Sequence, residues 1–238
     1  MFHGTAHVYD LLYEAAGKDY EAESADLHAL IQARTPGAAS LLDVACGTGA
    51  HLVHLRQWYE AVGVDVDPGM LEQARHRLPG GEFIEGDMRS FRLGRRFDAV
   101  SCLFSSIGYL SSVHDLDDAV ATMVSHLRAG GVFVLDGWIR PDAWTDQSPT
   151  HLLTASDENV TVARMSRSRR QDDKTFLDMH HLIGSTNGIE HVVDVHAMTL
   201  FTTEQYEASL RRAGLIGIET VEGPMRDRDR FVGVTPLR

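Results

Sequence analysis

Cysteine is scarce in this chain of 238 residues: Cys46 and Cys102 are the only two, and no CxxC spacing relates them. Isolated thiols of this kind indicate reduced residues, so we expect a cytoplasmic protein. Positively charged residues are also few: the sequence has 22 Lys and Arg but 34 Asp and Glu, which gives a formal net charge of −12. This balance argues against a general nucleic-acid or membrane surface, although a few arginines can still form a local pocket for an anion.

Long apolar runs are absent as well. Stretches such as 131–135 fall far short of the roughly 20 residues that a membrane-spanning helix needs, so we expect no membrane partner. The N-terminal region shows no basic segment followed by an apolar one, and we therefore expect no signal peptide. A chain of this length buries roughly 70% of its unfolded surface on folding, so it needs no disulfide or metal for stability.

Thirteen histidines are present, but no metal-binding pattern emerges from them. No HExxH arrangement occurs, and the adjacent pair His180 and His181 points to opposite faces of an expected strand. His51 and His54 share a helix face without an apparent third ligand. We expect no metal. Nor do we expect Cys46 to be a nucleophile, since it lies inside a glycine-rich turn with no specified histidine partner.

Apolar runs alternate with helical segments through the first 140 residues, which predicts a parallel sheet with helices on both faces. The strands are nearly continuous in apolar character, as strands buried on both faces are. The expected strands are 40–45, 61–66, 82–85, 97–104 and 132–138, and the expected helices are 19–33, 49–58, one opened by Asp67-Pro68, and 115–128 with its end at Gly130-Gly131.

The pattern changes after Pro141, where polar and apolar residues alternate without an intervening helix. This spacing predicts antiparallel strands at 159–168, 174–183 and 190–200, with turns at Asp172-Asp173 and Asn187-Gly188. A capped helix at 202–214 and strands at 215–221 and 230–236 complete the chain. We therefore predict an α/β fold, a Rossmann-like sheet with an antiparallel β insertion, divided into a core (1–140), the insertion (141–200) and a final helix and strands (201–238).

The first strand runs into the turn Asp43-Val44-Ala45-Cys46-Gly47-Thr48-Gly49. Glycines at this place let a ligand approach the backbone at the crevice beyond the strand ends. The spacing is not GxGxxG, and the acidic residue precedes the glycines, which weakens a dinucleotide interpretation. A nicotinamide oxidoreductase is accordingly disfavoured.

Two further acids follow strands at the same edge. Asp65 ends the second strand, where a carboxylate can accept both ribose hydroxyls, and Gly86-Asp87-Met88 follows the third, placed to meet an adenine. Each feature has a plain structural alternative: the glycines as turns, Asp65 as a helix cap, Asp87 as a loop residue. Their occurrence in order, each at a strand's carboxyl end, favours one nucleoside-binding site.

This combination resembles the class I methyltransferases. LLDVACGTG at 41–49 is similar to the family's first motif, Asp65 to its ribose acid, and Gly86-Asp87-Met88 to its adenine contact, over roughly residues 20–138. The resemblance implies S-adenosyl-L-methionine as cofactor. It also implies the class I form of the Rossmann-like sheet.

A narrower resemblance spans essentially the whole chain. The segments KDYEAESADL, LLDVACGTGAHL, GDMRSFRLGRRFDAV, FSSIGYL and the tail around EGP…FVGV are similar to the sugar N-methyltransferases of antibiotic deoxysugar biosynthesis. Those enzymes dimethylate the amino group of dTDP-linked aminodeoxysugars, as in desosamine and mycaminose formation. The resemblance implies such a sugar as substrate, with the C3 amine favoured over C4, and a homodimer.

The same resemblance implies roles for individual residues. On the cofactor side it implies Tyr20 at the methionine carboxylate, Tyr9 in an N-terminal cover, the backbone of Ala45 and Gly47 along the methionyl part, and Ser105 facing the sulfonium. On the substrate side the implied residues are Trp138, Arg164, and Arg228 or Arg230. Arginine suits a diphosphate because its planar fork makes paired charge-assisted hydrogen bonds. Relatives also place a tyrosine near the position of Met1 or Phe2.

Methyl transfer from a sulfonium to nitrogen requires a neutral amine, because an ammonium has no lone pair. Catalysis then rests mainly on orientation, and Tyr109 is the candidate catalytic residue that holds the amine or accepts its proton. Some relatives carry a histidine at this position. Tyr109 as a packing residue is the plain alternative.

Other functions remain open from the sequence. A methyltransferase acting on a sugar hydroxyl or on another small amine would share every cofactor residue. A hydroxyl acceptor would more often need a base or a metal, and no convincing one is evident. A non-catalytic cofactor-binding protein is a third possibility, which only product formation separates from an enzyme.

Overall fold

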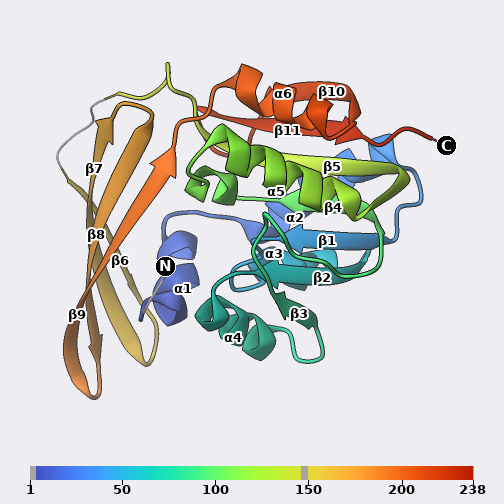
Figure 1. The fold of residues 1–238 in the computed structure, drawn as a ribbon. Helices are drawn as coiled ribbons and strands as arrows, with labels where there is room; N and C mark the ends of the chain where they lie inside the picture. The colour runs from blue at the N-terminus through green and yellow to red at the C-terminus, as the bar shows by residue number, and fades with distance from the viewer. Residues whose placement is uncertain (1–3, 146–149, 238) are drawn as a thin grey trace.

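The fold consists of two β-sheets with a helix between them (Figure 1). It is described here from a computed structural model, for residues 4–145 and 150–237. Met1 and Phe2, the positions compared with a tyrosine of relatives, lie outside the described residues.

The larger sheet has seven strands within the described residues, in the order β10-β11-β5-β4-β1-β2-β3. β1 to β5 pair in parallel, whereas β11 runs antiparallel between β5 and β10. This is the predicted Rossmann-like sheet. Its strands are β1 (Ser40–Val44), β2 (Glu60–Asp65), β3 (Glu82–Glu85), β4 (Phe97–Cys102), β5 (Leu127–Ile139), β10 (Ile216–Glu222) and β11 (Arg228–Val234).

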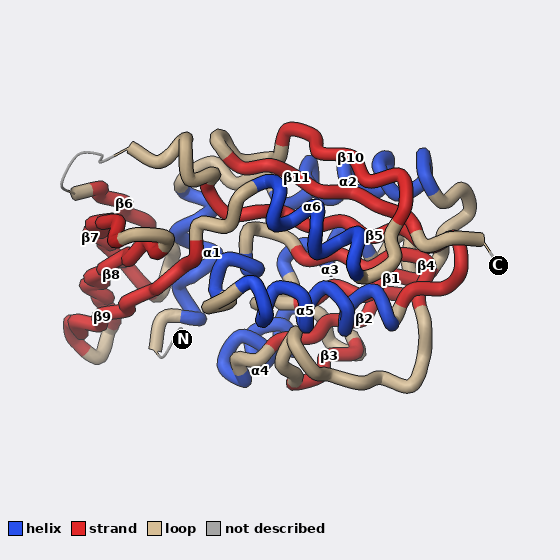
Figure 2. The backbone as a smooth tube through the Cα atoms, turned by 45° about the horizontal axis from the view of Figure 1, so that its top comes forward, coloured by secondary structure: helices blue, strands red, loops and turns tan. Residues whose placement is uncertain are grey.

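Helices cover both faces of this sheet, because successive residues of each strand are apolar and point to opposite sides. Leu41 of β1 packs in a core cluster with residues of α2 (Tyr20–Arg34), α3 (Ala50–Leu55) and α4 (Pro68–Arg77). Its neighbour Leu42 packs in the other cluster, with α5 (Val113–Ser125) and α6 (Thr203–Arg212), which lie side by side in Figure 2. In the described parts of the chain, no helix combines the length and apolarity that crossing a membrane requires.

The smaller sheet, called here the inserted sheet, is an antiparallel meander of β6 (His151–Ser156), β7 (Val160–Gln171), β8 (Lys174–Ser185) and β9 (Gly188–Thr199). β6 was not predicted, since Leu152 and Leu153 interrupt the alternation that marked the other three strands. Helix α1 (Ala6–Ala15) lies between the two sheets (Figure 1). Val8 and Leu12 of α1 pack against the inner face of the inserted sheet, the face toward the core.

Two predicted boundaries were wrong. Helix α5 ends at Ser125, and Gly130 and Gly131 lie within β5, where the pairing with β4 is irregular. The glycines therefore accommodate a β-bulge, and the φ of +74° at Gly130 is one that glycine adopts readily. The turn placed at Asn187-Gly188 lies at 186–187, because Gly188 already pairs with Ser185.

A close approach between β2 and the glycine turn gives a testable constraint. A Cβ at Gly63 would lie 2.6 Å from Cys46 Sγ and 2.8 Å from Phe83 Cδ1. We expect Gly63→Ala to lower the free energy of unfolding by about 1–3 kcal/mol, measured by urea denaturation, because the core cannot yield without displacing Cys46. Gly184→Ala is the matched strand control, since its Cβ would meet only ordinary contact at 3.7 Å. An equal change in both variants would contradict the expectation.

Candidate functional site

A cavity of about 830 Å³ lies where the carboxyl ends of β1 to β4 face the inserted sheet. This edge of a parallel sheet is where ligands bind in doubly wound folds. Helix α1 and the segment before β11 also contribute to its walls. The cavity brings together most of the residues predicted for cofactor and substrate, namely Tyr9, Tyr20, Ala45, Gly47, Asp65, Asp87, Met88, Tyr109, Trp138, Arg164 and Arg228.

The glycine turn forms one wall. Ala45, Gly47 and Gly49 have φ values of 58°, 56° and 72°, so the chain reverses sharply between β1 and α3. A Cβ at Gly47 would meet no atom within 4 Å, which leaves its backbone open to the cavity. This is the exposed backbone that the sequence predicted for a closely approaching ligand.

The Asp65 carboxylate holds that turn through hydrogen bonds to backbone amides. Its Oδ2 accepts a hydrogen bond from the Gly47 amide at 2.7 Å, and its Oδ1 accepts one from the Asp67 amide at 2.9 Å. Burial raises the pKa of Asp65, and these backbone donors oppose the rise. Each oxygen retains accepting capacity beyond its one backbone bond, so the carboxylate can hold the turn and a ligand hydroxyl together.

Asp87 and Met88 line the cavity after β3, as predicted. Asp87 is joined to Arg89, whose Nη2 lies 2.6 Å from Oδ2 and whose backbone amide donates to Oδ1 at 2.9 Å. These hydrogen bonds lower the pKa of Asp87. The carboxylate is therefore ionised and fixed in orientation at the cavity wall.

Tyr20 lines the cavity, but its hydroxyl is engaged elsewhere. It lies 3.2 Å from Asp10 Oδ1 of α1, which also accepts from Thr48 Oγ1 at 2.9 Å. Arg77 of α4 pairs with the other oxygen of Asp10 at 2.8 Å. In this arrangement the Tyr20 hydroxyl joins α2 to Asp10 of α1, and Thr48 joins the same carboxylate to the glycine turn.

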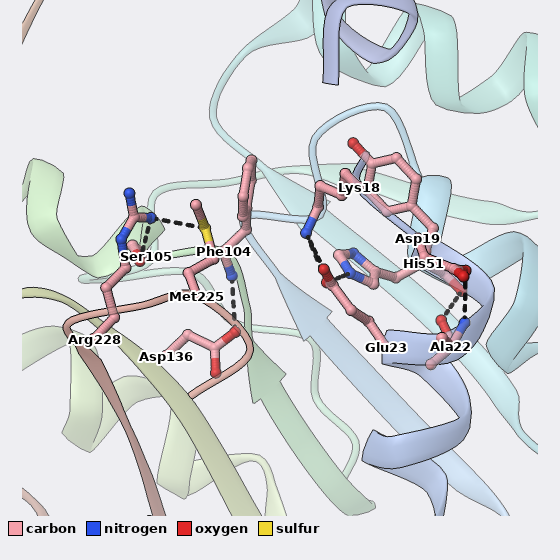
Figure 3. Close-up of polar contacts among 12 residues, drawn as sticks. Lys18, Asp19, Ala22, Glu23, His51, Phe104, Ser105, Asp136, Met225 and Arg228 are labelled. Atoms are coloured by element: carbon pink, nitrogen blue, oxygen red, sulfur yellow. Dashed lines mark hydrogen bonds and ion pairs between the residues drawn. The ribbon is translucent and has the colours of Figure 1, made fainter. Parts of the chain in front are cut away.

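Charged groups that were not predicted as site residues lie beside Tyr20, since Lys18 Nζ is 5.0 Å from the centre of its ring. Figure 3 shows Lys18 with Glu23 and His51. Lys18 Nζ contacts both carboxylate oxygens of Glu23, at 2.7 and 2.6 Å, and lies 3.8 Å from the centre of the Phe104 ring. His51 Nε2 lies 2.9 Å from Glu23 Oε2. All four residues line the cavity. A neighbouring ammonium and carboxylate of this kind match the two charges of an amino-acid moiety.

Ser105 does not line the cavity, in contrast to the role the resemblance implied for it. It is buried, its hydroxyl donates to the Gly137 carbonyl at 2.6 Å, and it accepts from Arg228 Nη1 at 3.1 Å (Figure 3). Its neighbours Phe104 and Ser106 line the cavity instead. The left-handed φ values of Phe104 and Ser105, 55° and 65°, turn the Ser105 side chain toward β5.

Arg228 and Trp138 form a pair at the opposite wall. The guanidinium lies 4.2 Å from the centre of the Trp138 ring, a cation–π contact, and its hydrogen bonds go to Ser105 and to Met225 Sδ. Burial lowers the pKa of Arg228 to about 10. No carboxylate among the described residues forms an ion pair with it.

Arg164 of β7 is a second arginine at this wall, and it is buried. Only 7% of the residue is exposed, its guanidinium lies 5.1 Å from the centre of the Tyr13 ring, and its Nε has no hydrogen-bond partner among the described residues. It also forms no ion pair with any carboxylate that the structure describes. A buried arginine without a carboxylate is costly unless an anionic ligand neutralises it.

Arg230 differs from these two arginines. Its Nε lies 2.6 Å from Asp136 Oδ1, its Nη2 lies 3.2 Å from Oδ2, and both side chains are buried. It is absent from the cavity wall. Of the two arginines offered as alternatives by the sequence, the structure therefore brings Arg228 to the cavity and pairs Arg230 inside the protein.

Tyr109 lies in the 3₁₀ helix η1 (Ser106–Tyr109), and its hydroxyl is 2.9 Å from His196 Nδ1 of β9. Both residues line the cavity. Burial raises the pKa of Tyr109 and lowers that of His196, so both groups are neutral near pH 7. Sequence reasoning missed His196, although its place two residues after Asp194 on an alternating strand puts both on the inner face.

The described residues contain no group of three or more His, Cys, Asp or Glu side chains arranged to hold a metal ion. The recognisable ligand-binding features are thus the nucleoside acids, the aromatic rings and the two unpaired arginines.

Comparison with known proteins agrees with this site. The family described as a methyltransferase domain matches residues 41–131. The chain is 44% identical over 231 residues to dTDP-3-amino-3,4,6-trideoxy-alpha-D-glucopyranose N,N-dimethyltransferase of Streptomyces venezuelae, covering 96% of this chain and 97% of that protein. It is 36% identical over 230 residues to dTDP-4-amino-2,3,4,6-tetradeoxy-D-glucose N,N-dimethyltransferase of Saccharopolyspora spinosa, covering 96% and 92%.

The fold comparison gives the same answer over the full length. The crystal structure of DesVI from Streptomyces venezuelae superposes with a TM-score of 0.91 at 44% identity, covering 97% of this chain and 98% of that one. Core, inserted sheet and terminal strands are therefore all shared. This chain belongs to the S-adenosylmethionine-dependent dTDP-aminosugar N,N-dimethyltransferases, which have the class I methyltransferase fold.

Proposed function

We propose that the chain transfers two methyl groups from S-adenosyl-L-methionine to the C3 amine of a dTDP-linked aminodeoxysugar in antibiotic deoxysugar biosynthesis. The preference for C3 rests on the relatives, since the 3-amino enzyme is 44% identical and the 4-amino enzyme 36%. The structural observation that carries the proposal is the pair of arginines at the cavity wall, buried Arg164 and half-buried Arg228, neither of which has a carboxylate partner among the described residues.

The residues at the ends of β1 to β3 fit the cofactor. The open backbone at Gly47 and the accepting oxygens of Asp65 suit a ribose, and Asp87 with Met88 suits an adenine. Lys18 and Glu23 match the carboxylate and ammonium of the methionyl part, a role the sequence had given to Tyr20. When bound, S-adenosylmethionine supplies an electrophilic methyl group on a sulfonium.

The substrate diphosphate provides the missing counter-charge for the arginines. Arg164 comes from the inserted sheet and Arg228 from β11, so an anion between them would be held by both parts of the protein. Guanidinium forks bind phosphate oxygens in pairs, and hydrogen bonds to charged groups are worth about 1.5–3 kcal/mol each. We assign the inserted sheet, within 141–200, to the substrate side for this reason.

Catalysis by the chain's own residues is mainly orientation. An amine held in line with the reacting carbon gains up to about 7–11 kcal/mol from pre-organisation. Tyr109 is our candidate for holding the amine, because its hydroxyl lines the cavity and is fixed by His196. The rings of Tyr9 and Tyr13 also form part of the cavity wall.

We further propose a homodimer formed through the outer face of the inserted sheet, the face turned away from the core. Its exposed apolar side chains continue across the strands, since Leu152 pairs with Met165, Met165 with His180, and His180 with Val193. Leu152 is 58% exposed and Met165 49%. An apolar patch of this kind on a sheet is typical of a protein–protein interface.

We also propose a cytoplasmic location. Cys46 and Cys102 are both buried free thiols, which suits a reducing compartment.

Mass spectrometry tests the reaction directly. The chain is incubated with S-adenosylmethionine and, in parallel, with dTDP-linked sugars carrying the amine at C3 or at C4. We expect the C3 isomer to gain two methyl groups and the C4 isomer to react at least about tenfold more slowly. Products on neither isomer, with cofactor binding intact by calorimetry, would refute the proposed substrate and point to a hydroxyl or a smaller amine.

The arginines are tested by steady-state kinetics. We expect Arg164→Met and Arg228→Met each to raise KM for the dTDP-aminosugar at least about tenfold, the effect of losing one charge-assisted hydrogen bond, with KM for S-adenosylmethionine changed less than about twofold. Arg169→Met is the control, because Arg169 is exposed on the same strand and faces Asp178 at 3.8 Å. Unchanged KM values in both variants would remove the arginines from the substrate site.

The dimer is tested by light scattering after gel filtration. We expect the wild type to run with twice the mass of one chain, and Met165→Glu and Leu182→Glu to run as monomers, because a charge on the apolar face disfavours its burial. Ile216→Glu is the control, as Ile216 is equally exposed but lies on β10. A dimer that survives both outer-face substitutions would place the interface elsewhere.

A further inference from the structure

Holding the amine requires only the Tyr109 hydroxyl and gives no role to His196, which is paired with it. The Tyr109 hydroxyl lies 2.9 Å from His196 Nδ1, the ring centres are 5.7 Å apart, and both side chains line the cavity. His196 itself is only 2% exposed, and its Nδ1 faces the tyrosine hydroxyl, so this nitrogen is linked to the cavity through Tyr109. A hydroxyl between a cavity and a buried imidazole can take a proton on one side and release one on the other.

The position of the tyrosine is tightly fixed. η1 packs against β5 and β9, and a Cβ at Gly108 would lie 2.8 Å from Met198 Cε and 3.0 Å from Trp138 Cβ. The 3₁₀ turn therefore cannot shift without displacing Trp138 of the substrate side. Met198 lies two residues beyond His196 on the same strand, so η1 and the histidine are positioned by one packing contact.

We propose that Tyr109 and His196 form a proton-exit pair, which removes the proton from the monomethylated amine so that the same nitrogen can accept a second methyl group. This inference rests on the proposed function. Tyr109 is then the catalytic residue that touches the substrate, and His196 is a positioning residue that acts through it.

The proton balance is complete without a further reactant. In the first transfer the amine lone pair forms the N–C bond, the C–S bond breaks, and its electron pair stays on sulfur. The nitrogen is now a secondary ammonium and lacks a lone pair. Its proton passes to Tyr109 Oη while the hydroxyl proton of Tyr109 passes to His196 Nδ1, which leaves a neutral amine, an intact tyrosine and an imidazolium that afterwards releases its proton to solvent.

The surroundings of the pair keep His196 neutral and therefore free to accept a proton near pH 7. Asp194 of β9 raises the pKa of His196, while His181 of β8, Arg164 of β7 and, above all, burial lower it. On the tyrosine side, burial above all, and then Tyr13, Asp194 and Asp65, raise the pKa of the hydroxyl. A depressed imidazole pKa means that His196 is neutral above that pKa and can accept a proton, and that this capacity is lost as pH falls through it.

The experiment compares first and second methylation in Tyr109→Phe and His196→Asn. With the dTDP-aminosugar we expect both variants to accumulate monomethyl product where the wild type gives dimethyl product. With the monomethylamino sugar, kcat at pH 7 should fall about tenfold or more while KM changes less than about twofold. Raising the pH should restore the rate, by about tenfold per pH unit, because hydroxide in solution replaces the lost acceptor.

A second readout needs no turnover. The ¹⁵N NMR titration of His196 in the free protein should shift in Tyr109→Phe, since the hydroxyl bonded to Nδ1 is gone. This measurement remains informative if His196→Asn is unstable.

His28→Asn is the matched control. His28 Nδ1 lies 2.9 Å from the Tyr59 hydroxyl, the same kind of pair, and neither residue lines the cavity. The inference is overturned if His196→Asn keeps the wild-type product ratio and pH profile, or if its defect is unaffected by pH. If the wild type methylates no aminosugar at all, the proposed function fails first, and that result is separate.

Discussion

The geometry of this site depends on the buried ion pair between Arg230 and Asp136. Asp136 accepts from Arg230 with both oxygens, and its Oδ2 also accepts from the Phe104 amide at 3.0 Å. Through that amide it holds the left-handed turn after β4, from which η1 and Tyr109 follow. Breaking a buried pair of this kind typically costs about 3–5 kcal/mol. The turn after β4 and strand β11 are thus held by one internal carboxylate.

The same pair explains why two arginines only two residues apart have different roles. In a regular strand Arg228 and Arg230 would share a face and a set of neighbours. The register of β11 against β5 shifts between them, so that Arg230 pairs opposite Asp136 and Arg228 opposite Ile139. The bulge leaves Arg228 over Trp138, away from the acid. Asp136 thus neutralises Arg230, and Arg228 remains available to an anion.

Local sequence predicted which residues meet at the ends of β1 to β3, because they follow one another along the chain. Gly47, Asp65 and Asp87 could be placed from the order of motifs alone, and the structure brings them to one cavity. Which of Arg228 and Arg230 lines the cavity could not be predicted. It depends on a bulge in the pairing of β11 with β5, and the residues around the two arginines do not reveal that bulge. The inward turn of Ser105 depends likewise on Asp136, 31 residues further along the chain.

The residues that we propose for the substrate side were harder to predict, for a different reason. His196 and Arg164 lie on strands whose alternation is clear, but which of the two faces meets the core is decided by contact with α1 and η1. β6 carried almost no pattern, because an edge strand with little burial is under weak constraint. The sequence therefore predicted the strands, whereas tertiary contacts decide which face of each strand meets the core.

The inserted sheet also has a consequence for how enzymes of this shape diversify. Arg164, Ser166 and Ser168 occupy alternate positions of β7 and all line the cavity, as do Leu177 and Met179 on β8. Each can change in size or polarity without altering the strand's pairing, because the ladder is made by backbone groups alone. The glycine turn and its acids lie on other elements and are untouched by such changes. A new sugar can thus be accommodated by single substitutions on one surface while the methyl-donor half of the protein stays constant.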